Sequence, residues 1–153
     1  MFVYRISRQK FANDLNGTGA RLNGGRWNSP GNAILYTSSY RSLALLEILV
    51  HTTNGFVPDD LRLITIEMPD NTSFQEIKHR EIKEELGKRG VNAQFNGIGD
   101  KWIQSCQSLV LKVPSIILPE EFNYLINPLH KDFNKVRIEN ISVFDFDKRL
   151  LVS

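Results

Sequence analysis

A basic, an aromatic and an acidic residue follow one another at short spacing in the first third of this chain. Arg26 lies in a glycine-rich stretch, Tyr36 ends an apolar run, and Glu47 lies in the segment after that. An arginine fork suits phosphate or pyrophosphate oxygens, and an aromatic ring packs against planar groups. A fixed carboxylate stabilises the positive charge that develops on ribose when an N-glycosidic bond breaks. The three side chains together suit cleavage of the N-glycosidic bond of a nucleotide.

Glu47 is the only charged residue in the run Leu43–Val50. If this run is helical, Leu43, Leu46 and Val50 share a face with Glu47, so the carboxylate points where the core should be. An unpaired carboxylate costs several kcal/mol to remove from water, so it needs partners or a chemical role. The alternative is a helix with a wet edge, where Glu47 reaches solvent or forms a buried ion pair.

Half of the 10 glycines lie between residues 17 and 31, which indicates tight turns or a close approach of the backbone to another group. In the stretch 24–31, neighbouring glycines let backbone N–H groups approach the anion that Arg26 would bind. The stretch is not a P-loop, because Gly-Arg stands where that motif requires Lys followed by Ser or Thr. It is not a dinucleotide-binding GxGxxG either, because the third glycine is missing. A surface turn with a solvent-facing Arg26, and a Tyr36 that serves only the core, remain open.

The elements that must position these residues follow from periodicity and from Gly and Pro boundaries. We expect strands at 2–6, 33–36, 61–68 and 108–113, an extended run at 116–118, and a strand pair or bent strand at 136–146. We expect helices from a cap at Ser38 or Ser39 to about His51, at 79–89 closed by Gly90, and at 99–106. The sum is an α+β domain with mostly antiparallel strands and few helices.

Composition excludes several classes of protein. The 153 residues suffice for one domain with a real core, and 19 basic against 17 acidic side chains leave a net charge of +2. No basic block concentrates this charge, so we expect no direct nucleic-acid binding. Lone Cys106, the lack of a secretory signal and the lack of a membrane-spanning run predict a cytoplasmic protein without membrane contact. His51 and His130 are too isolated for a metal site, so we predict no metal.

Ordered motifs run through nearly the whole chain. In the first half they are Tyr4-Arg5-Ile6, Gly19-Ala20, Gly24-Gly25-Arg26-Trp27-Asn28, Tyr36-Thr37-Ser38, and Leu43-Ala44-Leu45-Leu46-Glu47 with His51. In the second half they are Gly99-Asp100-Lys101-Trp102, Val110-Leu111-Lys112-Val113-Pro114-Ser115, Asn123-Tyr124-Leu125-Ile126-Asn127-Pro128-Leu129-His130 and Phe146-Asp147-Lys148-Arg149-Leu150. As an ordered set they resemble the RES-domain family of bacterial toxins, so residues 1–153 are identified as a single RES domain. The match is loosest between 75 and 97, where no motif aligns.

The resemblance implies a fold similar to that of ADP-ribosyltransferases, in which a split antiparallel β core with a few flanking helices holds NAD in a cleft. The catalytic residues that it implies are Glu47, Arg26, Tyr36 and Ser115. The NAD contacts that it implies are Arg26, Tyr36, Arg5, Trp27, Asn28 and Asn127. NAD is then the substrate, and no cofactor is expected. Without the resemblance, Ser115 is a turn residue, and Arg5 is either a phosphate contact or a strand-edge charge.

The resemblance also implies a function and a partner. Family members consume NAD by hydrolysis or phosphorolysis of the nicotinamide–ribose bond, which arrests growth, and a small helical antitoxin of the Xre family neutralises them by covering the cleft. A toxin dimer within a hetero-oligomeric complex is compatible with this picture. Two alternatives remain open: transfer of ADP-ribose to a protein side chain, and a module that binds a nucleotide or a partner without catalysis. The sequence does not decide the acceptor.

Overall fold

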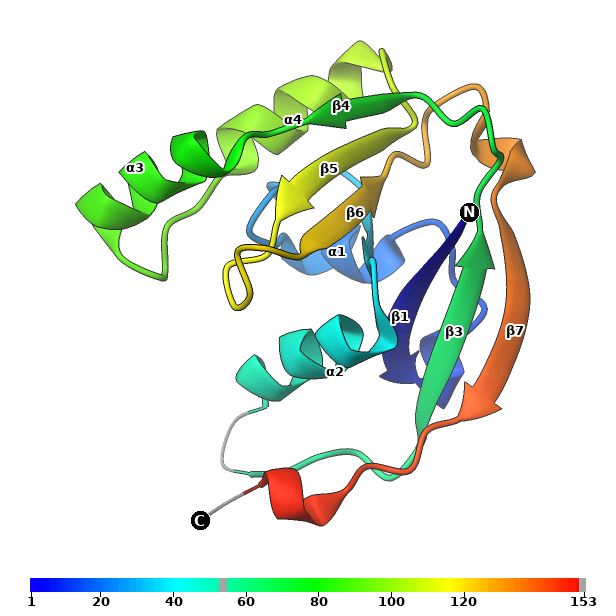
Figure 1. Ribbon diagram of the computed structural model, residues 1–153. Helices are drawn as coiled ribbons and strands as arrows, with labels where there is room; N and C mark the ends of the chain where they lie inside the picture. The colour runs from blue at the N-terminus through cyan, green and yellow to red at the C-terminus, as the bar shows by residue number, and fades with distance from the viewer. Residues whose placement is uncertain (53–54, 152–153) are drawn as a thin grey trace.

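A computed structural model describes residues 1–52 and 55–151. In these residues seven strands form one hydrogen-bonded sheet, and four α-helices flank it (Figure 1). The strands are β1 (Phe2–Arg8), β2 (Leu35–Ser38), β3 (Leu61–Glu67), β4 (Phe74–Glu76), β5 (Val110–Pro114), β6 (Phe122–Ile126) and β7 (Arg137–Val143). The helices are α1 (Thr18–Asn23), α2 (Arg41–Val50), α3 (His79–Arg89) and α4 (Asn96–Ser105). Short 3-10 turns lie at Gln9–Phe11, Phe133–Lys135 and Lys148–Leu150. The predicted α+β class is confirmed.

The sheet is divided into two groups of strands. Its order is β4-β5-β6-β2-β1-β3-β7, and in the described ranges β1 and β2 pair at a single position, Tyr4 opposite Ser38. By contrast, β1 pairs with β3 along its whole length. Figure 1 shows β1, β3 and β7 together on one side of the molecule and β4, β5 and β6 on the other. The expected split β core is confirmed, although β4 and β5 run parallel while the other neighbours are antiparallel.

Each face of the sheet carries an apolar core, and each large buried side chain contributes roughly 1.5–3 kcal/mol. The core beside α3 and α4 contains Trp27, Ile34, Ile77, Ile82, Ala93, Phe95, Trp102, Ile103, Leu111, Val113 and Leu125. The core shared by both strand groups contains Val3, Ala12, Leu35, Ile64, Ile66, Met68, Leu109, Val110, Ile126 and Val136. Leu35 and the half-buried Tyr36 therefore face opposite cores, as strand alternation requires.

Helix α2 carries Glu47 and packs against β1 and β2. It begins after Tyr40, whose side chain makes no capping hydrogen bond, so the predicted cap by Ser38 or Ser39 is wrong. The reason is that β2 extends to Ser38, and the N–H of Ser39 donates to β6 over 3.0 Å. Both serines therefore belong to the strand ladder, and their position at the edge of an apolar helix gave a misleading signal.

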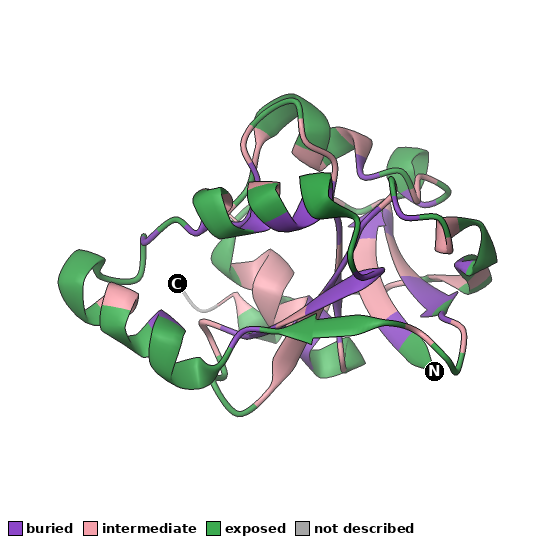
Figure 2. Ribbon diagram, turned by 90° about the horizontal axis from the view of Figure 1, so that it is seen from above, coloured by how far each residue is buried: buried purple, intermediate pink, exposed green. Residues whose placement is uncertain are grey.

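Several other predicted elements are confirmed. Strand β3 matches the prediction at 61–68, and α3 ends at Gly90 (φ 72°) as expected. Helix α3 buries only Ile82 fully, and Figure 2 shows most of it exposed, which fits its many charged side chains. Helix α4 begins at Asn96, three residues before the predicted start. Within the described ranges, every helix is too short or too polar to cross a membrane.

Other predicted boundaries need correction. The strand predicted at 33–36 lies two residues later, and β5 begins at Val110 and includes Pro114. Of the two alternatives for 136–146, a strand pair or a bent strand, the structure has the single strand β7, whose pairing with β3 shifts register between Thr65 and Ile66. The extended run predicted at 116–118 is a bend. Elements α1, β4 and β6 were not predicted: α1 lies inside the glycine-rich stretch, and β4 is three exposed residues held by parallel pairing with β5. Such short elements depend on tertiary pairing, which periodicity does not detect.

Helix α4 lies very close to the turn that contains Arg26. A Cβ atom at Gly99 would lie 1.7 Å from the carbonyl oxygen of Trp27. The N–H of Phe95 donates to the carbonyl of Arg26 over 2.7 Å, and the rings of Trp27 and Phe95 stack with centroids 4.8 Å apart. The absence of a side chain at Gly99 therefore allows α4 to hold this turn in place.

Replacing Gly99 with Ala should destabilise the protein, because the added methyl group would overlap the Trp27 carbonyl. We expect a loss of roughly 3 kcal/mol in the free energy of unfolding, measured by urea denaturation followed by circular dichroism. Gly97→Ala is the matched control, because a Cβ at that position of the same helix meets nothing within 4 Å. Its stability should be unchanged or rise by about 0.5–1 kcal/mol. Equal stabilities of the two variants would contradict the close packing.

Candidate active site

The Glu47 carboxylate is half-buried and receives two hydrogen bonds on the same oxygen. Asn123 on β6 donates from Nδ2 to Oε1 over 2.6 Å, and Ser115, which follows β5, donates from Oγ to Oε1 over 3.1 Å. Among the described residues, Oε2 receives no hydrogen bond and no cation pairs with Glu47. The half-buried carboxylate is therefore satisfied by two neutral donors, and Oε2 remains available for another contact.

Ser115 faces Glu47 and is enclosed, with 2% of its surface exposed. Its Oγ accepts from the N–H groups of Ile117 and Leu118 over 3.1 and 3.2 Å. A hydroxyl has one proton and two lone pairs, so the remaining proton is directed at Glu47. The structure thus brings together two predicted catalytic residues that are 68 positions apart in sequence. Ser115 therefore contacts the Glu47 carboxylate directly.

The Tyr36 hydroxyl is built into the glycine-rich turn. It accepts from the N–H of Trp27 over 3.1 Å and donates to Asn28 Oδ1 over 2.8 Å. A Cβ at Gly25 would lie 2.7 Å from this hydroxyl, so the glycine permits the approach. Burial raises the pKa of Tyr36 to about 12, which keeps the phenol protonated at neutral pH. The hydroxyl therefore serves the turn, and only the ring is left to meet another molecule.

The backbone N–H groups of the turn are also used within the protein. Internal acceptors take the N–H groups of Gly24 (Ala20 O, 2.8 Å), Gly25 (Asn28 O, 2.9 Å), Trp27 (Tyr36 Oη, 3.1 Å), Ser29 (Asp100 Oδ1, 2.9 Å) and Gly31 (Arg21 O, 2.7 Å). The expectation that these N–H groups approach a bound anion is therefore wrong. The glycines give the turn its shape, and anion binding depends on the Arg26 side chain.

Arg26 is half-buried and uses one guanidinium nitrogen to hold the segment before α4. Its Nη1 donates to the carbonyls of Val91 and Ala93 over 2.9 and 2.6 Å. Nε and Nη2 make no hydrogen bond among the described residues, so part of the fork is available for phosphate oxygens. The simple surface turn with a solvent-facing Arg26 is thus excluded.

The Glu47 and Arg26 groups lie on the same face of the sheet. Tyr36 and Ser38 are two residues apart on β2, so their side chains point to the same face of the sheet, about 7 Å apart. Ser38 is opposite Asn123 in the ladder. Arg5 is next to Tyr4 on β1, and Tyr4 is opposite Ser38, so Arg5 points to the other face. There its Nη1 donates to the carbonyl of Asp14 over 2.8 Å. Burial lowers the pKa of Arg5, while the nearby Asp14 carboxylate opposes this shift.

Trp27 and Asn28 are core residues in this structure, 4% and 1% exposed. Besides its bond to Tyr36, Asn28 donates from Nδ2 to the carbonyls of Ala20 and Asn32, each over 2.8 Å. Trp27 packs in the apolar core beside α4. Their contacts fix the turn that carries Arg26, so the geometry does not favour a substrate contact for either residue.

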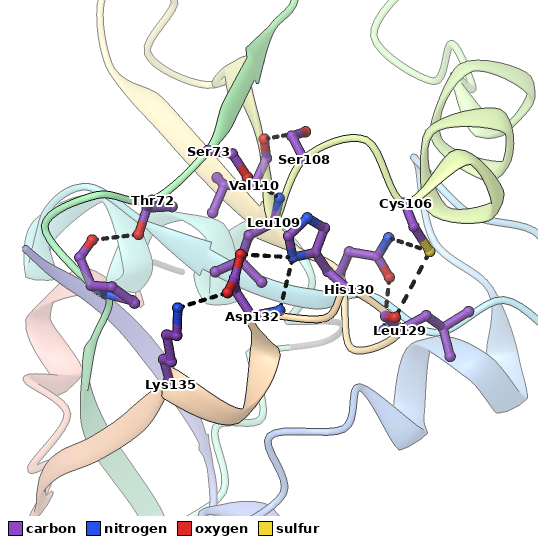
Figure 3. Close-up of polar contacts among 12 residues, drawn as sticks. Thr72, Ser73, Cys106, Ser108, Leu109, Val110, Leu129, His130, Asp132 and Lys135 are labelled. Atoms are coloured by element: carbon purple, nitrogen blue, oxygen red, sulfur yellow. Dashed lines mark hydrogen bonds and ion pairs between the residues drawn. The ribbon is translucent and has the colours of Figure 1, made fainter.

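Asn127 belongs to a different polar cluster at the far end of β6, roughly 13 Å from Asn123 along the strand. It is fully buried, donates to Ile103 O over 2.9 Å and accepts from the N–H of Leu129 over 2.9 Å. In the same loop, His130 Nδ1 accepts from the N–H of Asp132 over 3.1 Å (Figure 3). These contacts stabilise the loop between β6 and β7, so a substrate role for Asn127 stays a prediction that the geometry does not favour.

A groove of about 640 Å³ lies elsewhere, over β4, α3 and α4. Its lining includes Gln75, Glu85, Arg89, Gln94, Lys101 and Ser105. It contains none of the predicted catalytic residues, and its lining comes from the segment 75–97, in which no motif aligns, and from residues 98–111. The chemistry is therefore expected at Glu47, away from this groove.

Comparison with known proteins agrees with the motif analysis. Residues 2–148 match the RES domain. The chain belongs to the RES-domain family. Over 142 residues, which are 92% of this chain and 88% of the relative, it is 37% identical to a protein of Sphingobium sp. (strain YBL2) named Prs ADP-ribosylating toxin. It is also 34% identical to a protein of Photorhabdus laumondii named Toxin Res, over 99% of this chain and 97% of that protein.

A solved structure shares the fold of this RES domain. A chain of the MbcT–MbcA toxin–antitoxin complex of M. tuberculosis superposes with a TM-score of 0.70 at 17% identity, covering 98% of this chain and 86% of that chain. At this level of identity the similarity establishes the fold alone.

Sequence reasoning missed two polar residues of the RES-domain site. Local pattern marks Asn123 only as the start of a motif and predicts Ser38 or Ser39 as a helix cap. In the structure Ser38 Oγ donates to Asn123 Oδ1 over 2.7 Å, and Asn123 donates in turn to Glu47. The signal that would have found them is the strand register that places Ser38 opposite Asn123, and it is not visible before the strands are paired.

Tyr36→Phe should lower the free energy of unfolding of the RES domain by about 1–3 kcal/mol at neutral pH, because Trp27 N–H and Asn28 Oδ1 lose their partner. The pKa of Tyr36 is about 12 in the folded chain and about 10 when unfolded. The folded state thus binds the phenolic proton of Tyr36 more tightly than the unfolded state does. The stabilisation from protonated Tyr36 is therefore complete below about pH 10 and is lost as the pH rises through about 12. Urea titrations across this range should show a steeper loss for the wild type than for Tyr36→Phe.

Tyr40→Phe provides the control, because Tyr40 is 57% exposed and no hydrogen bond of its hydroxyl is found in the described residues. It should keep the stability and the pH dependence of the wild type. The same result for Tyr36→Phe would contradict the role of its hydroxyl in the turn.

Proposed function

We propose that this RES-domain protein is the toxin of a toxin–antitoxin module and that it cleaves the nicotinamide–ribose bond of NAD, as a glycohydrolase or phosphorylase. The observation that carries the proposal is the half-buried Glu47 carboxylate, held through one oxygen by Ser115 and Asn123, while the other oxygen receives no hydrogen bond from residues 1–52 and 55–151. Support also comes from relatives named as toxins that align over almost the whole chain. Depletion of NAD would then arrest growth.

The chemistry needs a fixed negative charge beside the ribose. When the bond between C1 of ribose and the nicotinamide nitrogen breaks, its electron pair goes to the ring nitrogen. Nicotinamide leaves as a neutral molecule, and positive charge develops on the ribosyl group. Glu47 Oε2 is the group in this chain suited to stabilise that charge and to accept a ribose hydroxyl proton in a hydrogen bond. An oxygen of water or phosphate then bonds to C1, and with water a proton is released to solvent.

Arg26 and Tyr36 would hold the rest of the substrate. The guanidinium nitrogens that do not hold Val91 and Ala93 would bind pyrophosphate oxygens, and the Tyr36 ring would pack against nicotinamide or ribose. Neither role needs a cofactor, since NAD is the substrate.

An antitoxin partner is part of the proposal. The structural similarity to a chain of a toxin–antitoxin complex supports it. We expect a small helical antitoxin of the Xre family that covers the face carrying Glu47, a cytoplasmic location where NAD is available, and no direct contact of the toxin with nucleic acid or membrane.

A second candidate function keeps the site and changes the acceptor. The Sphingobium relative, 37% identical, is named an ADP-ribosylating toxin, which favours transfer of ADP-ribose to a protein side chain. Both reactions release nicotinamide, so mass spectrometry of proteins from intoxicated cells separates them: ADP-ribose attached to a protein indicates transfer, and free ADP-ribose or its 1-phosphate indicates hydrolysis or phosphorolysis.

Glu47→Gln should abolish growth arrest and lower nicotinamide release from NAD on the order of 1,000-fold. Its fold should persist, because the carbonyl oxygen of Gln can still accept from Ser115 and Asn123. Induced cultures measure the growth effect, and purified toxin with NAD measures the release. Glu84→Gln, an exposed residue of α3, is the matched control and should behave as the wild type. The proposal would be contradicted by NAD that stays intact after prolonged incubation with folded wild-type toxin, or by growth arrest that persists in Glu47→Gln.

A further inference from the structure

Two successive hydrogen bonds lead to Glu47, and in each of them the donor's proton points toward Glu47. Ser38 Oγ donates to Asn123 Oδ1 over 2.7 Å, and Asn123 Nδ2 donates to Glu47 Oε1 over 2.6 Å. A carboxylate only accepts hydrogen bonds, so the amide nitrogen of Asn123 must face Glu47 and its oxygen must face Ser38. Ser38 is 4% exposed, so no bulk solvent competes for this contact.

These hydrogen bonds from Ser38 through Asn123 to Glu47 determine which oxygen of Glu47 is free. Ser115 and Asn123 both donate to Oε1, and they come from the end of β5 and from its neighbour β6. Two donors on one oxygen fix both the position of the carboxylate and its rotation. The described residues supply no donor to Oε2, which is therefore left for the reacting group.

We propose that Asn123, backed by Ser38, is a positioning residue that rotates the Glu47 carboxylate so that Oε2 faces the ribose of the substrate. The inference rests on the proposed function for the identity of the substrate, and it assigns Asn123 no substrate contact. Misplacement of a catalytic group by about 1 Å costs on the order of 100-fold in rate. The effect of losing Asn123 should therefore appear in kcat, while KM for NAD stays nearly constant.

Asn123→Asp is the sharpest test, because it keeps the shape of the side chain and replaces the donor by a second carboxylate facing Glu47. We expect kcat for nicotinamide release to fall on the order of 100-fold, with KM within about threefold of the wild type. Asn134→Asp, the same change at an exposed position in the loop before β7, is the control and should retain wild-type kinetics. Circular dichroism and thermal unfolding show that each variant is folded.

Ser38 distinguishes positioning from general stability. Ser38→Ala leaves the Asn123 oxygen without its donor and should lower kcat roughly tenfold, whereas Ser38→Thr keeps a hydroxyl and should restore activity. A merely structural role would lower the unfolding temperature in both Ser38 variants and leave kcat of the folded protein unchanged.

Growth arrest on induction is measured in parallel, because it reports toxicity whichever acceptor is used. If wild-type toxin arrests growth but does not cleave NAD, the proposed function fails, and loss of arrest in Asn123→Asp still supports the positioning role. Wild-type arrest or wild-type kcat in Asn123→Asp overturns the inference. A rise in KM at constant kcat overturns it as well, because it would make Asn123 a substrate contact.

Discussion

A carboxylate that leaves bulk water needs hydrogen-bond donors, and the candidate site is arranged around meeting that need for Glu47. The helix that carries Glu47 packs on β1 and β2, whereas its two donors come from the β5–β6 side, 68 and 76 residues away in sequence. The two strand groups are joined through β1 and β2 at one residue pair. Helix α2 packs on both sides of that junction, and the hydrogen bonds to Glu47 add contacts from α2 to Asn123 on β6 and to Ser115 after β5.

The glycine-rich turn has a different role: it holds Arg26 beside an apolar core. Its N–H groups, the Tyr36 hydroxyl and the Asn28 amide satisfy one another. Buried polar groups without partners are costly, so this internal pairing is what allows the turn to pack under α4. An anion placed here would meet a single guanidinium, shared with the carbonyls of Val91 and Ala93, and not a cradle of backbone N–H groups.

The arrangement around Glu47 bears on bond cleavage more directly than on the acceptor. In the proposed reaction, the carboxylate would stabilise the charge that develops before the acceptor bonds to ribose. Relatives with the same carboxylate could therefore differ in acceptor, and the name of the Sphingobium relative is compatible with this separation.

The sequence by itself determined the α+β class, the helix that carries Glu47, the exposed helix α3 and the family, because periodicity, glycine boundaries and ordered motifs are local signals. It also singled out Glu47, and the family resemblance added Ser115, which the structure brings beside Glu47. The tertiary structure alone decided that Asn123 and Ser38 complete that group, that Arg5 faces the other side of the sheet, and that Asn127 lies at the far end of β6. The physical reason is strand register: it sets the face and the neighbours of every side chain, and it depends on pairings between segments far apart in the chain.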